Sequence, residues 1–237
     1  MKLLTAFGIG LATVAAVVIA LWLSADVVLK TGIEKLGPEV LKAPVTVKGV
    51  RLELESGKVL IQGLVVGNPA AFGPANAIRL GKIDIAIDTG TVAWDVIVIK
   101  RLAIEAPEVT YETRDATSNL DALKRNVDEY LHASSESGNR SPDKKRERRF
   151  IVDNFTIRNG KVNLSGGLPS GSSVSVALPA IQLRHVGRNS GGVTLVELTK
   201  LVTSEITSKS GRVAVATLNR IRRSAGDTLS SMREIFR

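Results

Sequence analysis

The sequence predicts an α+β protein, in which an N-terminal transmembrane helix is followed by an antiparallel β-sheet with a few amphipathic helices. Three observations lead to this fold class. Residues 3–25 carry no charge, apolar residues then recur at every second position in several short runs, and the last part of the chain returns to helical periodicity. Val, Ile and Leu dominate the apolar side chains and aromatic residues make up only 4%, which suits pleated strands.

The uncharged stretch 3–25 has the length of a membrane span. As a helix its 23 residues extend roughly 35 Å, enough to cross a hydrocarbon core roughly 30 Å thick. A cleaved signal peptide is the alternative, but Leu23 stands where a cut after Ala25 would need a small residue. We therefore expect an uncleaved anchor over residues 1–26.

Charge predicts the orientation and the partners. The short cationic tail of Met1 and Lys2 favours a cytoplasmic amino terminus, so we expect the body outside the cytoplasm. The formal net charge of +9 then matches anionic lipid, since the chain lacks zinc-finger spacing and aromatic-rich RNA-binding motifs. We expect membrane lipids as partners and no nucleic acid.

Residues 27–131 form the first β-rich segment, which ends in a capping helix. After a short helical run, apolar residues alternate from Val45 onward, with phase slips beside Gly49 and Gly63 that indicate β-bulges. Turn-separated strands of this kind predict an antiparallel sheet built from hairpins. The helix that follows has one apolar face, formed by Leu120, Leu123, Val127 and Leu131.

Three further segments complete the chain. Residues 132–149 are rich in Ser, Gly, Lys and Arg without apolar periodicity, and we expect a disordered basic linker. Its alternative role is a patch for anionic lipid. Residues 150–192 form a second β-rich repeat, and residues 193–237 form amphipathic basic helices that Gly211 and Gly226 interrupt.

An internal repeat links the two β-rich segments. Residues 100–113 align with residues 153–166, and each copy reads as two paired strands joined by a tight turn. The turn falls at Ala106-Pro107 in the first copy and at Asn159-Gly160 in the second. The aligned apolar residues are Leu102 with Phe155, Ile104 with Ile157, Val109 with Val162, and Tyr111 with Leu164.

Several short motifs occur in an order that resembles the AsmA-like family of membrane-anchored envelope proteins. The resemblance covers about residues 1–205, and the chain is short beside the large members, which extend the sheet by many repeats. The motifs are APVTV (43–47), GLVVGNP (63–69) leading to Phe72-Gly73, APEVTYE (106–112) followed by Ser118-Asn119-Leu120, IRNGKV (157–162) and LPAIQL (178–183).

The resemblance implies that the antiparallel sheet curves into an apolar groove that binds or hands on lipid, in lipid transport or outer-envelope assembly. It also implies a single-pass protein of the inner membrane with its body in the periplasm. The alternative is a scaffold or assembly subunit of an envelope complex, or a homo-oligomer, in which these apolar faces meet protein and no lipid enters. The candidate groove residues are Ile83, Ile85, Ile87, Ile97, Ile99, Ile104, Val109, Ile157 and Val162.

The C-terminal tail is basic and amphipathic. Residues 209–237 hold seven Lys or Arg against two acidic residues. Such a helix either lies on an anionic membrane surface or is a solvated face that packs on the sheet. The candidates for membrane-surface contact are Arg220, Arg222, Arg223 and Arg233.

Sequence signals of catalysis and metal binding are missing. The chain has no cysteine and two histidines, neither with an acidic residue at triad or metal-ligand spacing. Phosphate-binding loops and nucleophile elbows do not occur either. We therefore expect no enzymatic activity, no metal and no cofactor.

Overall fold

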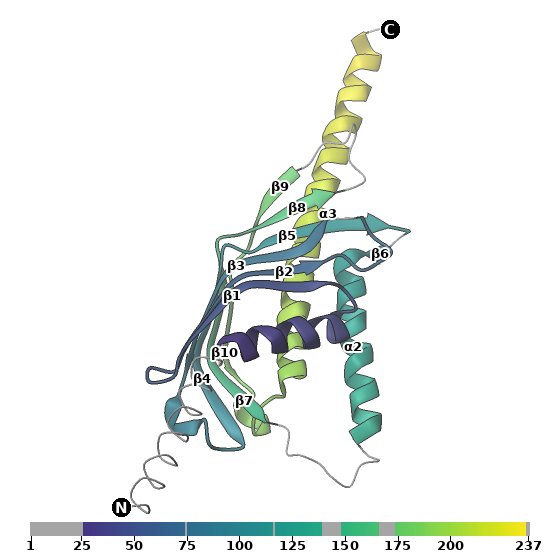
Figure 1. The fold of residues 1–237 in the computed structure, drawn as a ribbon. Coiled ribbons are helices and arrows are strands. Elements are labelled where there is room, and N and C mark those ends of the chain that lie inside the picture. The colour runs from purple at the N-terminus through teal and green to yellow at the C-terminus, as the bar shows by residue number, and fades with distance from the viewer. Residues whose placement is uncertain (1–25, 74, 116, 139–147, 166–173, 236–237) are drawn as a thin grey trace, which may run out of the picture.

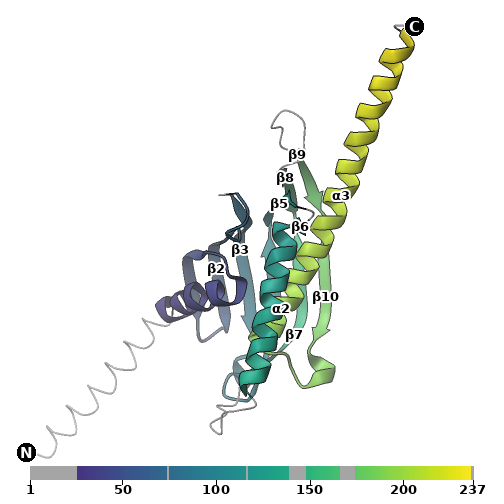
Figure 2. The same ribbon diagram turned by 90° about the vertical axis from the view of Figure 1, so that its right-hand side faces the viewer.

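The computed structural model describes residues 26–235, apart from residues 74, 116, 139–147 and 166–173. In this part of the chain ten strands form one strongly curled, half-barrel mixed sheet, and three helices lie on its hollow side (Figure 1, Figure 2). The α+β class and the curved sheet are thereby confirmed. The strands are β1 (Val45–Glu53), β2 (Lys58–Gly67), β3 (Asn76–Ile87), β4 (Val96–Glu105), β5 (Glu108–Arg114), β6 (Thr117–Ser118), β7 (Arg149–Arg158), β8 (Gly160–Ser165), β9 (Val174–Leu178) and β10 (Ile181–Val186). The helices are residues 26–41, α2 (Asn119–Gly138) and α3 (Leu195–Ile235), with the 3-10 turns η1 (Thr89–Thr91) and η3 (Arg188–Ser190).

The sheet consists of long bent strands, because three pairs of consecutive strands lie end to end. β4 and β5 follow one another along the same edge of β3, where Lys82 faces Glu105 and Arg79 faces Glu108. In the same way β7 and β8 follow one another along β4 and β5. β10 and β9 then form the last position of the sheet, antiparallel to β7 and β8.

Two pairings in the sheet, β4 with β7 and β5 with β8, are parallel, so the expectation of a purely antiparallel sheet is wrong. Turns join β1 to β2, β2 to β3 and β3 to β4, and these neighbours are antiparallel. Between β5 and β7, however, α2 carries the chain back to the end of the sheet where β4 begins. A crossover of this kind makes the next strand parallel. β7 therefore pairs parallel to β4, and β8 pairs parallel to β5.

The internal repeat is confirmed, and its two copies lie side by side. The chain does not turn back at Ala106 or Asn159, because the strands before and after each bend run in the same direction along the same neighbour. The predicted hairpin turns are therefore in-line bends. Residues that align in the sequence face each other directly in the sheet, namely Leu102 and Phe155, Ile104 and Ile157, Val109 and Val162, Tyr111 and Leu164.

The bends form a row across the sheet. Gly63, Ala106 and Asn159 have positive φ angles of 60°, 47° and 55°, and the registers of their strands place them in one line. Pairing continues through this row without a shift, so the phase slip expected at Gly63 is real but no extra residue bulges out. Because every strand bends at the same place, the whole sheet turns toward the helices (Figure 1).

The hydrophobic core lies between the hollow side of the sheet and the helices. α2 and α3 pack against each other and against β5, β8 and β9. The apolar face predicted for the helix after residue 119 is confirmed, since Leu120, Leu123 and Val127 are each 0% exposed. Buried residues from both β-rich segments form one cluster with the helices. The two segments therefore share a single core.

The helix of residues 26–41 covers the outer edge of β1. The carboxylate of Asp26 accepts a hydrogen bond from the Leu52 N–H at 2.6 Å, and that of Glu34 accepts one from the Val47 N–H at 2.9 Å. An edge strand with free N–H groups is a template for unwanted pairing. The two acidic side chains therefore help to protect this edge.

The helices differ from expectation in two respects. α3 is continuous over 41 residues, so the interruptions expected at Gly211 and Gly226 are wrong. A glycine costs only about 1 kcal/mol in a helix, and α3 offsets this by burying Leu198, Ile206 and Ala214. α2 extends to Gly138, so the first residues of the expected linker are helical.

Residues 1–25 of the predicted anchor lie outside the described residues, and Asp26 begins the helix of residues 26–41. Among the residues that the structure does describe, no helix is both long and apolar enough to cross a membrane. Residues 139–147 of the expected linker also lie outside them.

Candidate functional site

Eight of the nine predicted groove residues come together in the core, and the ninth, Ile97, is buried outside this cluster. Ile85 and Ile87 are half-buried and pack against the main core cluster. The other seven are exposed by 7% or less, namely Ile83, Ile97, Ile99, Ile104, Val109, Ile157 and Val162. None of the nine lines the cavities on α3, at the loop after β2, or between β3, β5 and β8. Contact between lipid and these residues stays a prediction, because seven of the nine are buried.

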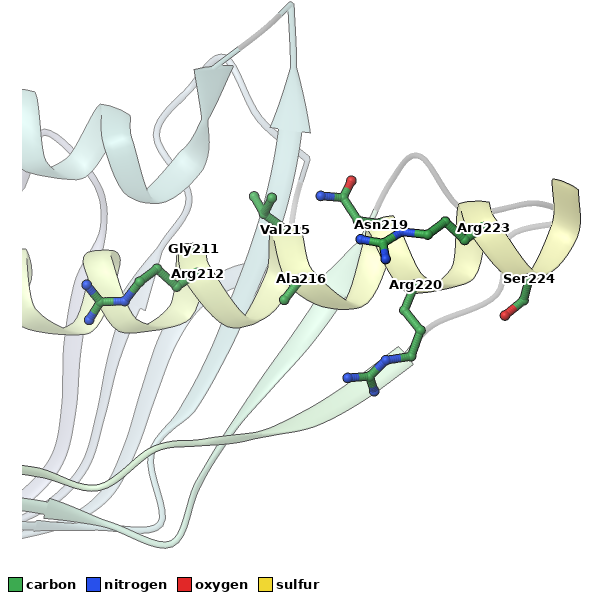
Figure 3. A pocket seen from close by; sticks show the side chains of 8 residues that line it. All are labelled: Gly211, Arg212, Val215, Ala216, Asn219, Arg220, Arg223 and Ser224. Atoms are coloured by element: carbon green, nitrogen blue, oxygen red, sulfur yellow. The ribbon is translucent and has the colours of Figure 1, made fainter. Parts of the chain in front are cut away.

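An open cavity of about 830 Å³ lies along α3, where the helix leaves the sheet (Figure 3). Its described lining comes from α3 alone, as pairs of neighbouring residues that recur every four positions, which places these side chains on one side of the helix. Small and apolar residues form the middle of the cavity, and polar or charged side chains surround them. The lining residues are Gly211, Arg212, Val215, Ala216, Asn219, Arg220, Arg223 and Ser224.

The first half of α3 holds the helix in place. At its start Thr194 and Glu197 form a capping box, in which the Glu197 N–H donates to Thr194 Oγ1 at 3.1 Å and the Thr194 N–H donates to Glu197 Oε2 at 2.7 Å. Lys200 then forms an ion pair with Asp128 of α2 at 2.7 Å. Small buried residues further along, Thr203, Thr207, Ser210 and Ala214, line the packed face. The second half of α3 extends past the sheet (Figure 2), which leaves the cavity open.

The cavity has a positive electrostatic character. Arg212, Arg220 and Arg223 are exposed, and none of them forms an ion pair with any acidic residue in the described part of the chain. Guanidinium groups bind phosphate and carboxylate oxygens in bidentate geometry. Val215 is 49% exposed and adds apolar surface between the arginines. The cavity can therefore accept a ligand that has both an anionic group and an apolar part.

No protein-family model matches this chain, and no curated protein matches it. Function is therefore inferred from geometry and chemistry.

The structure places only part of the predicted membrane-surface set in the cavity. Arg220 and Arg223 line it, together with Arg212, which the prediction missed. Positions 212, 220 and 223 differ by 8 and 11 residues, and this helical spacing was the signal that could have identified Arg212. The side chains of Arg222 and Arg233 lie outside the described part of the structure, although both positions belong to α3.

A second polar site joins motifs that are far apart in the sequence. The Glu112 carboxylate accepts hydrogen bonds from the Gly73 N–H at 2.9 Å and from Asn68 Nδ2 at 3.0 Å. Asn119 Nδ2 donates to Asn68 Oδ1 and to the Thr110 carbonyl, both at 2.8 Å, and Asn119 Oδ1 accepts from the Glu112 N–H at 3.0 Å. We call these five residues the asparagine clasp.

The asparagine clasp has a structural role. It fastens the loop after β2 to the end of β5 and to the first residue of α2. Two of the motifs from the sequence analysis meet here, GLVVGNP with Phe72-Gly73 and APEVTYE with Ser118-Asn119-Leu120, although sequence reasoning assigned their polar residues no function. Asn119 is 0% exposed, so its amide is closed to a ligand, whereas Asn68 and Gly73 also line the cavity at the loop after β2.

Proposed function

We propose that the protein is an inner-membrane-anchored envelope protein that binds an anionic lipid, in support of lipid transport or outer-envelope assembly. The observation that carries the proposal is the α3 cavity, where an apolar floor lies between three arginines without acidic partners in the described structure. Its volume falls in the range of about 300–1,000 Å³ that is typical of small-ligand sites.

The shape of the cavity suits a lipid better than a soluble anion. A phosphate or carboxylate group would lie on Arg212, Arg220 or Arg223, and an acyl chain would cover Val215 and Ala216. Exposed apolar surface of this kind gains roughly 25 cal/mol for each Å² that a ligand covers. A small hydrophilic anion would gain only the contacts with the arginines.

Two further observations support the proposal. The half-barrel sheet with an apolar hollow side agrees with the architecture that the resemblance to the AsmA-like family implies. The span predicted over residues 3–25 would keep the body next to a lipid source.

The scaffold alternative also has an observation in its favour. The helices close the hollow side of the sheet, and buried side chains fill it from Val152 at 0% to Leu102 at 9% exposure. A protein that used the whole groove for lipid would leave this face open. For this reason we place the bound lipid at the α3 cavity and not over the center of the sheet.

Lipid analysis of the purified full-length chain tests the proposal. The protein is extracted from membranes in mild detergent, and native mass spectrometry determines how much lipid stays bound. We expect a bound anionic lipid in the wild type and its loss in the triple variant Arg212→Gln, Arg220→Gln, Arg223→Gln. Ala216→Trp should also reduce binding, because it fills the cavity without changing the charge.

A matched variant controls for net charge. Lys48→Gln, Arg51→Gln and Arg184→Gln together remove three positive charges from exposed positions outside the cavity. This variant should keep its lipid. Equal lipid content in both triple variants would contradict the proposed site. The scaffold alternative would be favoured if the wild type carried no lipid and co-purified with stoichiometric protein subunits.

A further inference from the structure

Large apolar residues are exposed mainly at one end of the half-barrel. Among the described residues seven are strongly exposed, and only Val215 lies elsewhere, on the far part of α3. Single exposed apolar residues are ordinary, whereas a cluster of them marks a contact surface. The clustered residues and their exposed fractions are Val27 63%, Val28 67%, Leu54 39%, Val92 43%, Trp94 69% and Leu195 48%.

Backbone hydrogen bonds show that these residues share one end, which we call the hairpin end. It comprises residues 26–28, 54–57, 88–95 and 187–195. The Ile87 N–H donates to the Gly57 carbonyl at 2.8 Å, which joins the β1–β2 turn to the end of β3. The Arg149 N–H donates to the Asp95 carbonyl at 3.0 Å, which joins the β3–β4 connection to the start of β7.

The remaining parts of the hairpin end are attached in the same way. Phe150 and Val193 exchange two backbone hydrogen bonds, at 2.7 and 2.8 Å, just before α3 begins at Leu195. Asp26 holds the start of the first helix to Leu52, next to the β1–β2 turn. Figure 1 shows both hairpins and the start of α3 at the end of the molecule opposite to the carboxyl end of α3.

Trp94 is held in a defined position on this surface. The backbone N–H of Trp94 donates to the Thr91 carbonyl at 3.0 Å, and Arg148 Nη1 donates to the Val92 carbonyl at 2.8 Å. η1 is itself capped by Asp88, whose carboxylate accepts from the Gly90 N–H at 3.2 Å. These bonds form an ordered turn, and the indole ring on it faces solvent.

The predicted membrane span, which directly precedes the described residues, indicates what covers this surface. The predicted membrane span ends at Ala25, and the exposed Val27 and Val28 follow within one helical turn. Any bilayer that holds residues 3–25 therefore lies next to the hairpin end. Tryptophan is enriched where a protein meets the interface between lipid and water, because its ring is apolar and its N–H is polar.

We propose that the hairpin end is a membrane-contact face, with Trp94 in the interfacial layer of the bilayer that holds the anchor. This inference rests on the membrane anchoring in the proposed function, but it does not depend on lipid binding at α3. It assigns a role to the β1–β2 and β3–β4 turns, which dock the sheet on the membrane and fix its orientation.

Tryptophan fluorescence of the full-length chain in lipid vesicles tests the contact. The sequence has two tryptophans, Trp22 and Trp94, so Trp22→Phe leaves Trp94 as the only emitter. We expect blue-shifted emission, strong quenching by lipids brominated on the acyl chain near the headgroup, and weak quenching by aqueous acrylamide. Emission at the wavelength of exposed tryptophan, with full access for acrylamide, would overturn the contact face.

A matched probe at the other end serves as the control. Arg114→Trp, combined with Trp22→Phe and Trp94→Phe, places a single tryptophan at the last residue of β5, an exposed position outside the hairpin end and outside the α3 cavity. Its quenching by brominated lipid should be much weaker than that of Trp94, and equal quenching would count against the proposal.

Alkaline carbonate extraction separates the two possible failures. Protein that stays in the membrane while Trp94 is not quenched disproves the contact face and leaves the anchor intact. Protein that is released from the membrane disproves the anchor, and the contact face with it.

Discussion

Removal of one amide in the asparagine clasp should destabilise the fold more than most single substitutions do. In Asn119→Ala three polar groups lose their partner, namely the Glu112 N–H, the Thr110 carbonyl and Asn68 Oδ1. Asn119 is 0% exposed, so no water contacts its amide, and its three partners belong to half-buried residues. Few surface substitutions leave so many unpaired groups behind.

The magnitude follows from the number of groups. An unsatisfied buried polar group costs about 1–3 kcal/mol, and water that enters the vacated volume can serve some of the three. Asn68 also keeps its bonds to Gly73 and Glu112. We therefore expect a loss of about 3–5 kcal/mol in the free energy of unfolding. For a chain of this size that corresponds to a decrease in Tm of about 10 °C.

Thermal unfolding of the full-length protein in detergent measures this loss. Asn119→Asp conserves the size of the side chain and its acceptor, but it removes both donors and points a carboxylate at two oxygens. It should be at least as destabilising as Asn119→Ala. Because the size of the side chain is unchanged, such a loss would come from the hydrogen bonds and not from packing. Asn163→Ala is the control, because its bond with Ser175 is exposed, and it should cost less than about 0.5 kcal/mol. If Asn119→Asp stays within about 1 kcal/mol of the wild type, this account of the clasp is wrong.

Three further predictions concern the bend, the edge strand and the topology. Gly63→Ala should lower Tm, because φ at this position is +60° and a Cβ would lie 2.8 Å from the side chain of Lys48. Gly49→Ala is the control, since its Cβ would meet no atom within 4 Å, and it should leave Tm unchanged. Glu34→Ala should speed hydrogen exchange of the Val47 N–H in β1, which donates to this carboxylate. Glu39→Ala changes an exposed residue of the same helix and should leave the exchange of the Val47 N–H unchanged. A reporter fused after Arg237 should be active outside the cytoplasm, and activity inside it would contradict the predicted orientation.

The strands and the repeat could be predicted from the sequence because they depend on local periodicity. Alternation of apolar residues identified β3. The two repeat copies could be aligned in the sequence, and the same offset recurs as the register between their strands in the sheet, but the pairing itself was not predicted. The direction of that pairing could not be obtained in this way. It depends on which end of the sheet α2 returns the chain to, and nothing in the periodicity of a strand encodes that.

The candidate site was less accessible to sequence reasoning. Alternation identified Ile83 and Ile157 as inward-facing, but it does not distinguish a residue that packs under a helix from one that lines an open groove. The clasp joins Asn68 to Glu112 and Asn119 across 44 and 51 positions, a distance over which no local pattern operates. Helical spacing does indicate the arginine cluster on α3, provided that the helix is taken to continue through Gly211.

The two ends of α3 constrain how lipid binding and membrane contact can combine. α3 begins at the hairpin end with Leu195, and at the helical rise Arg220 and Arg223 lie about 40 Å farther along it. Charges so far from the bilayer of the anchor are screened, since the Debye length is about 8 Å at physiological ionic strength. With the hairpin end on that bilayer, these arginines do not lie on its surface, so the cavity would bind a lipid that has already left it. The Trp94 probe distinguishes the two arrangements, because full access of acrylamide to Trp94 in a chain that resists carbonate extraction would place another face, and not the hairpins, against the membrane.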